Sequence, residues 1–236
     1  MSTHTHVSAN ASTSASMNAS MIRRLVTKDL YLYRWFIVGA TLAGLASLFV
    51  SGLHGMTGLI LFMTTIVALG IFIAMYGILV ERKEKTLLFV LSLPVTPLQY
   101  ATAKVFAALI AFLVPVLVLA AAALSYNVAF DPPLNGEIPF TVVTLGLFLA
   151  NFCFLVALLL VSGAEFWAVA GVVLTNLTVP LFMNVVVGLP GIREYIQGPV
   201  AVWSPTIFAI LGTEATVAVL SLGIAFYVQS RRTDFI

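Results

Sequence analysis

The sequence has very few charged residues. Lys, Arg, Asp and Glu together make up only 8% of the 236 residues, whereas about 25% is usual for a soluble domain. Hydrophobic residues make up 61% of the chain, and the mean hydropathy is +1.10. This composition excludes an ordinary soluble domain. The net charge of +2 also leaves no excess of basic residues for binding nucleic acid.

Two further shortages narrow the possible classes of protein. The single cysteine, Cys153, lies in an apolar run, so it cannot form an internal disulfide and is expected to pack as a small hydrophobe. A P-loop for ATP needs a Gly-Lys pair, because backbone amides and the lysine together hold the phosphates. The four lysines instead follow Thr, Arg, Glu and Ala. We therefore expect no nucleotide, cofactor or metal site in this chain.

Long uncharged runs are what the sequence does contain. Residues 57–80 and 105–130 carry no charge over 24 and 26 residues, and each run exceeds the ~20 residues that cross a bilayer as a helix. Helix is expected because lipid offers the backbone no hydrogen-bond partners and the runs do not alternate as barrel strands do. The sequence thus predicts an all-α, polytopic membrane protein with six transmembrane helices. The expected spans are 35–53, 57–80, 101–125, 139–162, 166–187 and 208–228.

The residues before the first span fall into two parts. Residues 1–20 are rich in Ser, Thr, Ala and Asn without periodicity, which predicts a disordered tail. Residues 21–34 place Ile22, Leu25 and Leu30 at helical spacing, with Asp29 interrupting this apolar stripe and basic residues opposite it. The pattern predicts an amphipathic interfacial helix on the anionic inner leaflet; a basic flank alone is the alternative. Residues 21–236 are expected to form one membrane domain.

The basic residues predict the orientation of the chain. Ten of the eleven lie before span 1, between spans 2 and 3, or after span 6, and only Arg193 lies in the other loops. Those other loops carry Asp131 and Glu194 instead. Basic residues are retained on the cytoplasmic side of a membrane. We therefore expect a multi-pass protein of the plasma (inner) membrane with both termini in the cytoplasm.

The longest polar stretch between spans is 81–104, ERKEKTLLFVLSLPVTPLQYATAK. It begins with alternating charges, continues as a short apolar helix over 86–93 and is interrupted by Pro94. Thr96 and Pro97 suit the N-cap and first position of the helix that becomes span 3. A short apolar helix between two breaks either docks a soluble partner or rests on lipid.

This segment resembles the loop between spans 2 and 3 of type-2 permeases of ABC transporters. Those proteins carry a similar ER-x-x-x-T-L … L-P-V-(S/T) … K string there, and their layout of a basic N-terminal helix and six spans is also similar. The tail 1–20 is not part of the family pattern. The resemblance implies that the coupling loop 81–100 contacts a separate ATPase subunit. The residues that it assigns to this contact are Glu81, Arg82, Glu84, Thr86, Leu87, Leu88, Phe89, Leu91 and Leu93.

The same resemblance implies a set of partners. The chain would be the permease subunit of an ATP-driven exporter, working as a dimer with a second permease chain, identical or different. Two copies of the ABC ATPase would bind to the permease and would themselves bind ATP and Mg. The other expected partners are membrane lipid and an unidentified substrate. No nucleic acid is expected to bind.

Polar side chains inside spans are candidates for a translocation path, because placing them in lipid is costly. Asn151, Asn176 and Asn184 would line such a path or form hydrogen bonds between helices. Glu214 would line or gate it or, as a first-turn residue, would reach headgroup water. The Ser-Pro pair at 204–205 is typical of a helix start, so a short re-entrant helix before the true span is an alternative there.

Two other classes of protein remain as alternatives. A secondary transporter or channel would need coupling acids near the bilayer centre, and Glu214 is the only candidate. An intramembrane enzyme of the rhomboid type would need G-x-S-G, but the Ser-Gly pairs at 51–52 and 162–163 both lack the first glycine. His54, near the first pair, sits at a helix end, where a loop would hold a catalytic base poorly. The sequence favours a permease without enzymatic activity.

Overall fold

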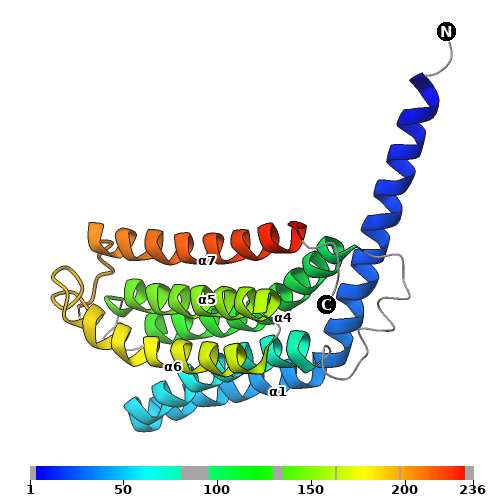
Figure 1. Ribbon diagram of the computed structural model, residues 1–236. Helices are drawn as coiled ribbons and strands as arrows, with labels where there is room; N and C mark the ends of the chain where they lie inside the picture. The colour runs from blue at the N-terminus through cyan, green and yellow to red at the C-terminus, as the bar shows by residue number, and fades with distance from the viewer. Residues whose placement is uncertain (1–3, 81–95, 130–134, 163, 197, 232–236) are drawn as a thin grey trace.

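The computed structural model describes residues 4–80, 96–129, 135–162, 164–196 and 198–231, and its regular elements are helices (Figure 1). They are α1 (His4–Ala74), the π-helix η1 (Met75–Val80), α4 (Pro97–Ala129), α5 (Glu137–Ser162), α6 (Glu165–Val187) and α7 (Pro205–Arg231). Six helical stretches are long and apolar enough to cross a membrane, and each contains one predicted span. They are Ser20–Leu53, Gly55–Val80, Leu98–Tyr126, Glu137–Ser162, Glu165–Val187 and Pro205–Arg231. The prediction of an all-α protein with six membrane-spanning helices is confirmed.

Helix α1 contains the first of these spans and most of the second, which run in opposite directions. The chain reverses at Gly55, whose φ of +24° is a conformation that side-chain-bearing residues rarely adopt. Gly58 lies so close to the preceding turn that an added Cβ would overlap the backbone of Ser51. Glycine at both positions therefore allows the two spans to form a tight hairpin, whose turn lies at the lower left of Figure 1.

The first part of α1 differs from the expected disordered tail, because the helix begins at His4. No glycine or proline occurs before Gly39, so nothing in the sequence interrupts helix here. Figure 1 shows this part of α1 projecting away from the bundle and α1 changing direction before it joins the other helices. A helix that stands away from packing partners is only marginally stable in water. The disorder of residues 1–20 in solution, like the interfacial position of 21–34, stays a prediction.

The bundle packs around α5, which contacts α1, α4, α6 and α7. Ile66, Phe112 and Leu159 are fully buried in the core, and the rings of Phe112 and Phe152 stack with their centroids 4.1 Å apart. Between helices in lipid, close van der Waals packing provides the attraction, because lipid tails are as apolar as the side chains. The core therefore depends on shape more than on apolar composition.

Alternating helix directions gather the connections at two ends of the bundle. We call one end the base; it lies at the right in Figure 1 and is marked by Val80, Pro97 and Arg231. The opposite end, the far end, is marked by Gly55 and residues 188–204. The segment 81–95, which starts and ends at the base, lies outside the described residues.

At the far end, the connection between α6 and α7 folds back onto the bundle. Ile192 packs with Val143, Val186 and Ile207 in a second apolar cluster. The backbone is held to the start of α5 by a hydrogen bond from the Gly136 amide to the carbonyl of residue 198, 2.9 Å long. Helix α7 is continuous from Pro205, and 188–196 and 198–204 contain turns instead of a helix. The helix start at 204–205 is therefore confirmed, and the re-entrant helix considered as an alternative is not found in these residues.

Candidate functional site at the base of the bundle

The nine residues assigned to an ATPase contact all lie within 81–95, outside the described residues. The structure describes the two points between which that segment runs: η1, which ends at Val80, and α4, which begins at Pro97. At the start of α4, the Thr96 hydroxyl accepts a hydrogen bond from the Gln99 amide (3.2 Å), and the Gln99 side chain accepts one from the Thr96 amide (3.0 Å). This reciprocal pair is a capping box, so the predicted N-cap at Thr96 is confirmed.

A buried ion pair joins α1 to α4 just above this cap. Lys104 Nζ lies 2.6 Å from Asp29 Oδ2, and the two side chains are only 6% and 7% exposed. The pair explains why Asp29 interrupts the apolar stripe of α1: this stripe faces the bundle, where Leu30 and Phe36 pack against the core. A buried charge is tolerated when its partner and hydrogen bonds are in place, so the pair fixes α1 against α4.

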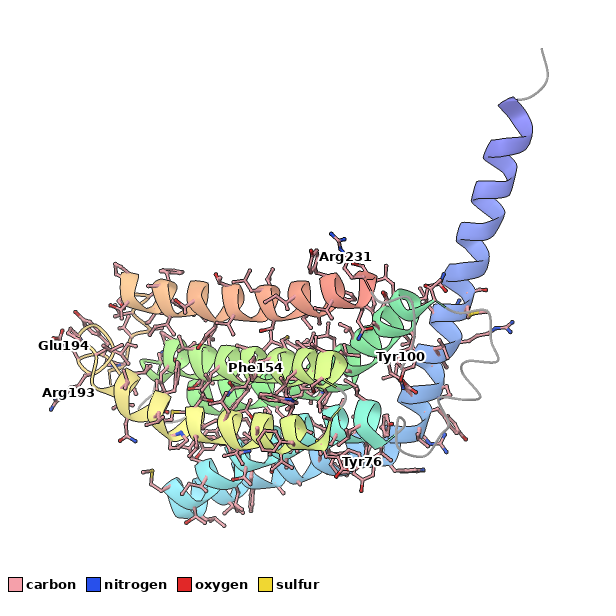
Figure 2. The ribbon with its side chains drawn as sticks, viewed as in Figure 1. Tyr76, Tyr100, Phe154, Arg193, Glu194 and Arg231 are labelled. Atoms are coloured by element: carbon pink, nitrogen blue, oxygen red, sulfur yellow. The ribbon has the colours of Figure 1, made fainter. Side chains whose placement is uncertain are left out.

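A second contact joins the same face of α1 to η1. The Tyr33 hydroxyl donates a hydrogen bond to the Tyr76 carbonyl (3.2 Å). The Phe72 ring lies between those of Phe36 and Tyr76, with centroid distances of 3.4 and 4.4 Å. π-Helical turns are rare and concentrate at functional sites. Figure 2 shows Tyr76 and Tyr100 at the base, where η1 and α4 approach α1.

Together these contacts form what we call the base clamp: the Asp29–Lys104 ion pair and the Tyr33–Tyr76 hydrogen bond. Asp29 and Tyr33 are one helical turn apart, so they lie on one face of α1. A cavity of about 10 Å³ between the two contacts is lined by both residues, by Gly77 and by Lys104. The clamp therefore ties one helix face to both points between which 81–95 runs. Sequence reasoning missed the clamp, although an acid within an apolar stripe was a signal for it.

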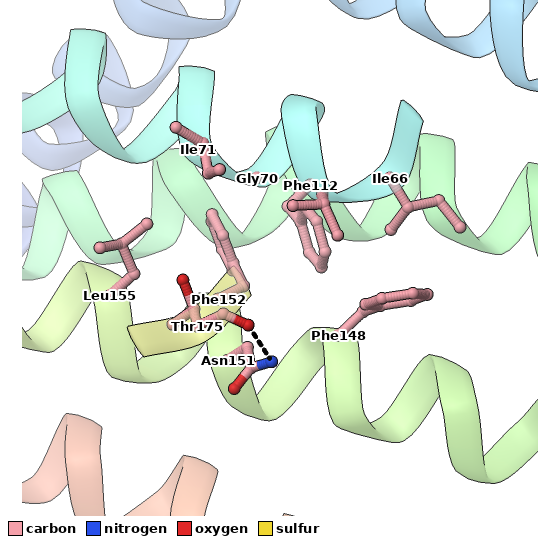
Figure 3. A pocket seen from close by; sticks show the side chains of 10 residues that line it. Ile66, Gly70, Ile71, Phe112, Phe148, Asn151, Phe152, Leu155 and Thr175 are labelled. Atoms are coloured by element: carbon pink, nitrogen blue, oxygen red, sulfur yellow. Dashed lines mark hydrogen bonds between the residues drawn. The ribbon is translucent and has the colours of Figure 1, made fainter. Parts of the chain in front are cut away.

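Asn151, one of four residues predicted to line a path, bonds between helices. Its Nδ2 donates to Thr178 Oγ1 at 2.8 Å and to the Thr175 carbonyl at 3.4 Å, which links α5 to α6. Asn151 and Thr175 also line a cavity of about 30 Å³, walled mostly by apolar side chains such as Phe112 (Figure 3). A cavity of this size holds one or two water molecules and no larger solute. Of the two roles considered for Asn151, the hydrogen bond between helices is the one found.

Asn176 and Asn184 lie on the face of α6 that points away from the bundle. Both side chains are exposed, and each Nδ2 donates only to a carbonyl of its own helix, that of Val172 or Pro180, at 2.8 Å. Pro180 has no amide, so the carbonyl of Asn176 also loses its usual helical partner. This face is otherwise apolar, with exposed side chains such as Leu177 and Leu181, so the two asparagines are its polar exceptions.

Glu214, the last of the four residues predicted to line a path, lies between α7 and α5. Its side chain is buried, with 7% of the residue exposed, and neither carboxyl oxygen has a hydrogen-bond partner among the described residues. The carboxyl rests against Gly146, where an added Cβ would overlap Oε2. Because α7 begins at Pro205, Glu214 is in its third turn and faces another helix. Glu214 is therefore not a first-turn residue, and its carboxyl faces α5 instead of the end of its own helix.

The comparisons with known proteins return no relative. No family model matches the sequence, and neither the curated proteins nor the solved structures contain a match. Within the described residues, no three His, Cys, Asp or Glu side chains gather as metal ligands would. Functional argument for this chain therefore rests on the residues and contacts described above.

Proposed function

We propose that this chain is the permease subunit of an ATP-driven ABC exporter. The observation that carries the proposal is the base clamp. The segment 81–95, which contains most of the permease-like string at 81–104, runs between η1 and α4, and one face of α1 is tied to both of these elements. A push on this segment by a soluble partner would therefore move α1, η1 and α4 together. A loop that passes the movement of an ATPase to the membrane-spanning helices requires such a connection.

In this proposal the base faces the cytoplasm and the ATPase chains bind there. The permease performs no covalent step: ATP and Mg bind to the ATPase, whose closure displaces the loop. The spans then change between two discrete packings, because close-packed helices do not deform continuously.

The outward face of α6 supports a second permease chain in the assembly. Polar groups that face hydrocarbon are costly, and this otherwise apolar face carries the Asn176 and Asn184 side-chain amides and a carbonyl freed by Pro180. We propose that the two copies meet around a hydrated path and that these groups border it. Asn151, which is satisfied within the chain, takes no part in the path.

The test of the proposal is a paired substitution in the loop. Leu88→Asp with Phe89→Asp should release the ATPase while the spans remain in the membrane, because burying each such side chain contributes about 1.5–3 kcal/mol. The matched control is Phe166→Asp with Trp167→Asp, two exposed apolar residues at the start of α6, also at the base. Co-purification of the ATPase and its substrate-stimulated activity are the measurements. Retention of partner and transport by the loop variant would sink the proposal.

Orientation is tested separately by reporter fusions. Reporters after residues 20 and 236 should give cytoplasmic signals, and one at residue 134 an external signal, as the distribution of basic residues predicts. An external signal from the C-terminal fusion would contradict the placing of the base in the cytoplasm.

A secondary transporter is the second candidate, because Glu214 is an acid buried within a span. The two candidates differ in their energy source. The permease alone, reconstituted in vesicles, should bind no ATP and should move nothing down an imposed proton or sodium gradient. Gradient-driven uptake that is lost in Glu214→Gln would favour the second candidate.

A further inference from the structure

The interface between α5 and α7 holds buried polar groups in two contrasting settings. Towards the base, Gln229 is 5% exposed, and its Nε2 donates to the Leu160 carbonyl at 2.7 Å. Towards the far end, both oxygens of Glu214 and the Ser204 hydroxyl are buried without a partner among the described residues. One helix pair is thus joined by a buried hydrogen bond at one end and carries unsatisfied groups at the other.

Glu214 lies far from the ends of α7, where its carboxyl lacks hydrogen-bond partners among the described residues. It is nine residues after the start of α7 at Pro205, which places it about 13 Å along the helix. Gly146, against which the carboxyl rests, is likewise nine residues after the start of α5. Both residues therefore lie in the third turn of helices that are long and apolar enough to cross a membrane. A carboxyl there without hydrogen bonds destabilises the packing that buries it.

The rest of α7 is held to the bundle along one face, and most of that contact is with α5. Its four buried residues, Ile207, Glu214, Ala225 and Gln229, form one stripe, and most other positions are exposed. At the far end, the contacts of this stripe are apolar, through Ile207 and Leu211 with Val143. Separating these side chains towards lipid loses their close packing but breaks no hydrogen bond of the stripe, and lipid tails replace the lost apolar contacts.

We infer that α7 pivots on its base end and opens away from α5 at the far end, as a gate. The Gln229–Leu160 hydrogen bond is the pivot, and Glu214 is the group that opening exposes to hydrogen-bonding partners. Gly146 gives the closed gate room for the carboxyl. The use of this gate in export rests on the proposed function, whereas the motion itself belongs to this chain and needs no ATPase.

Spin-label distances in the full-length chain, in lipid nanodiscs, test this motion. In a Cys153→Ala background, the far-end pair is Met56→Cys with Thr213→Cys, and the base pair is Leu98→Cys with Ser230→Cys, all at exposed positions. The far-end pair should show two distances and the base pair one. Glu214→Leu should remove the longer far-end distance and leave the base pair unchanged. A single far-end distance in the parent, or two distances that persist in Glu214→Leu, would overturn the inference.

A chemical measurement covers the case in which the leucine variant folds poorly. Val143 is fully buried beside the gate. A membrane-impermeant maleimide should react slowly with Val143→Cys, and Glu214→Met should lower that rate by about tenfold, since a thioether in place of the carboxyl needs no hydrogen-bond partner in the closed packing. Gln229→Leu, the matched control, should broaden the base-pair distance and leave the maleimide rate unlowered. An equal rate in parent and Glu214→Met would count against the gate. Failure of ATPase co-purification with these results intact would reject only the exporter.

Discussion

The base and the far end of this bundle both bury polar side chains, but they treat them differently. At the base, Asp29 and Lys104 form an ion pair and Gln229 reaches a backbone carbonyl. At the far end, Glu214 and Ser204 are buried with unpartnered side-chain oxygens among the described residues. In a low-dielectric interior a paired polar group fixes geometry, whereas an unpaired one favours any rearrangement that supplies a partner. The contacts at the base therefore hold its helices as a unit, whereas the far end carries the unsatisfied groups from which the gate is inferred.

The aromatic side chains repeat this difference. At the base, Tyr33, Phe36, Phe72 and Tyr76 form a continuous set of ring contacts between α1 and η1. At the far end, the buried residues of the cluster around Val143 and Ile192 are aliphatic, and the rings of Trp203 and Phe208 are tilted, with their centroids 6.1 Å apart. Stacked rings add specific geometry to their packing energy, and of these two ends it is the base that has them among the described residues.

Breaking the ion pair should have the largest effect. Lys104→Leu removes the partner that lies 2.6 Å from the buried Asp29 carboxylate and leaves Lys28 nearby, at 3.7 Å, so the free energy of unfolding should fall by about 3 kcal/mol, the lower end of the range for breaking a buried pair. The double variant Asp29→Leu with Lys104→Leu should recover most of this loss, because no buried charge remains. Thermal unfolding of the purified chain in detergent provides the comparison. A single variant as stable as the parent would show that the clamp does not hold the base together.

At the two ends of α7, apolar substitutions should have opposite signs. Glu214→Leu removes an unsatisfied buried group and should raise the free energy of unfolding by about 1–3 kcal/mol, whereas Gln229→Leu removes the buried hydrogen bond to the Leu160 carbonyl and should lower it by about 0.5–1.5 kcal/mol. Melting temperatures of the two variants, measured side by side, test this. The same sign for both variants would erase the distinction between base and far end.

Removing one hydroxyl from the clamp should have a smaller effect. Tyr33→Phe keeps the ring contact with Phe72 but loses the hydrogen bond to the Tyr76 carbonyl. Since this bond is exposed, the loss of stability should be near the lower end of the usual range, about 0.5 kcal/mol. Hydrogen exchange should quicken in η1 and remain unchanged in α7. Faster exchange in both elements would mean that the clamp and the gate are not separate units.

The two asparagines should differ from each other, one with an effect as small as that of the lost hydroxyl and the other with none. Asn151→Leu loses the bond to Thr178 and should cost about 0.6 kcal/mol, the average for such bonds in membranes. Asn176→Leu should leave the stability of the single chain unchanged, because this amide bonds only within its own helix. Under the proposed function it should nevertheless weaken pairing of permease chains, measured by crosslinking in the membrane. Equal destabilisation by both variants would contradict the division between them.

Much of the fold was predictable because its signals are local. Residues 57–80 must be helical in lipid whatever surrounds them, since each backbone group finds its partner within the segment. The capping box at Thr96 follows from a Thr and a Gln three residues apart. The helical state of residues 4–20 was not predictable in this way, because their composition lacks the apolar periodicity that reports packing.

Which residues of the candidate site lie together depends on how segments far apart in the sequence pack against each other. The sequence alone determined six spans, the uneven distribution of basic residues and the permease-like string at 81–104, because hydropathy and charge act along the chain. Only the tertiary structure decided that Asp29 pairs with Lys104, 75 residues away, and that Glu214 rests on Gly146. The physical reason is that the side chains of a helix point outwards all around its axis. Only the packing of neighbouring helices decides which of those side chains contact protein and which contact lipid.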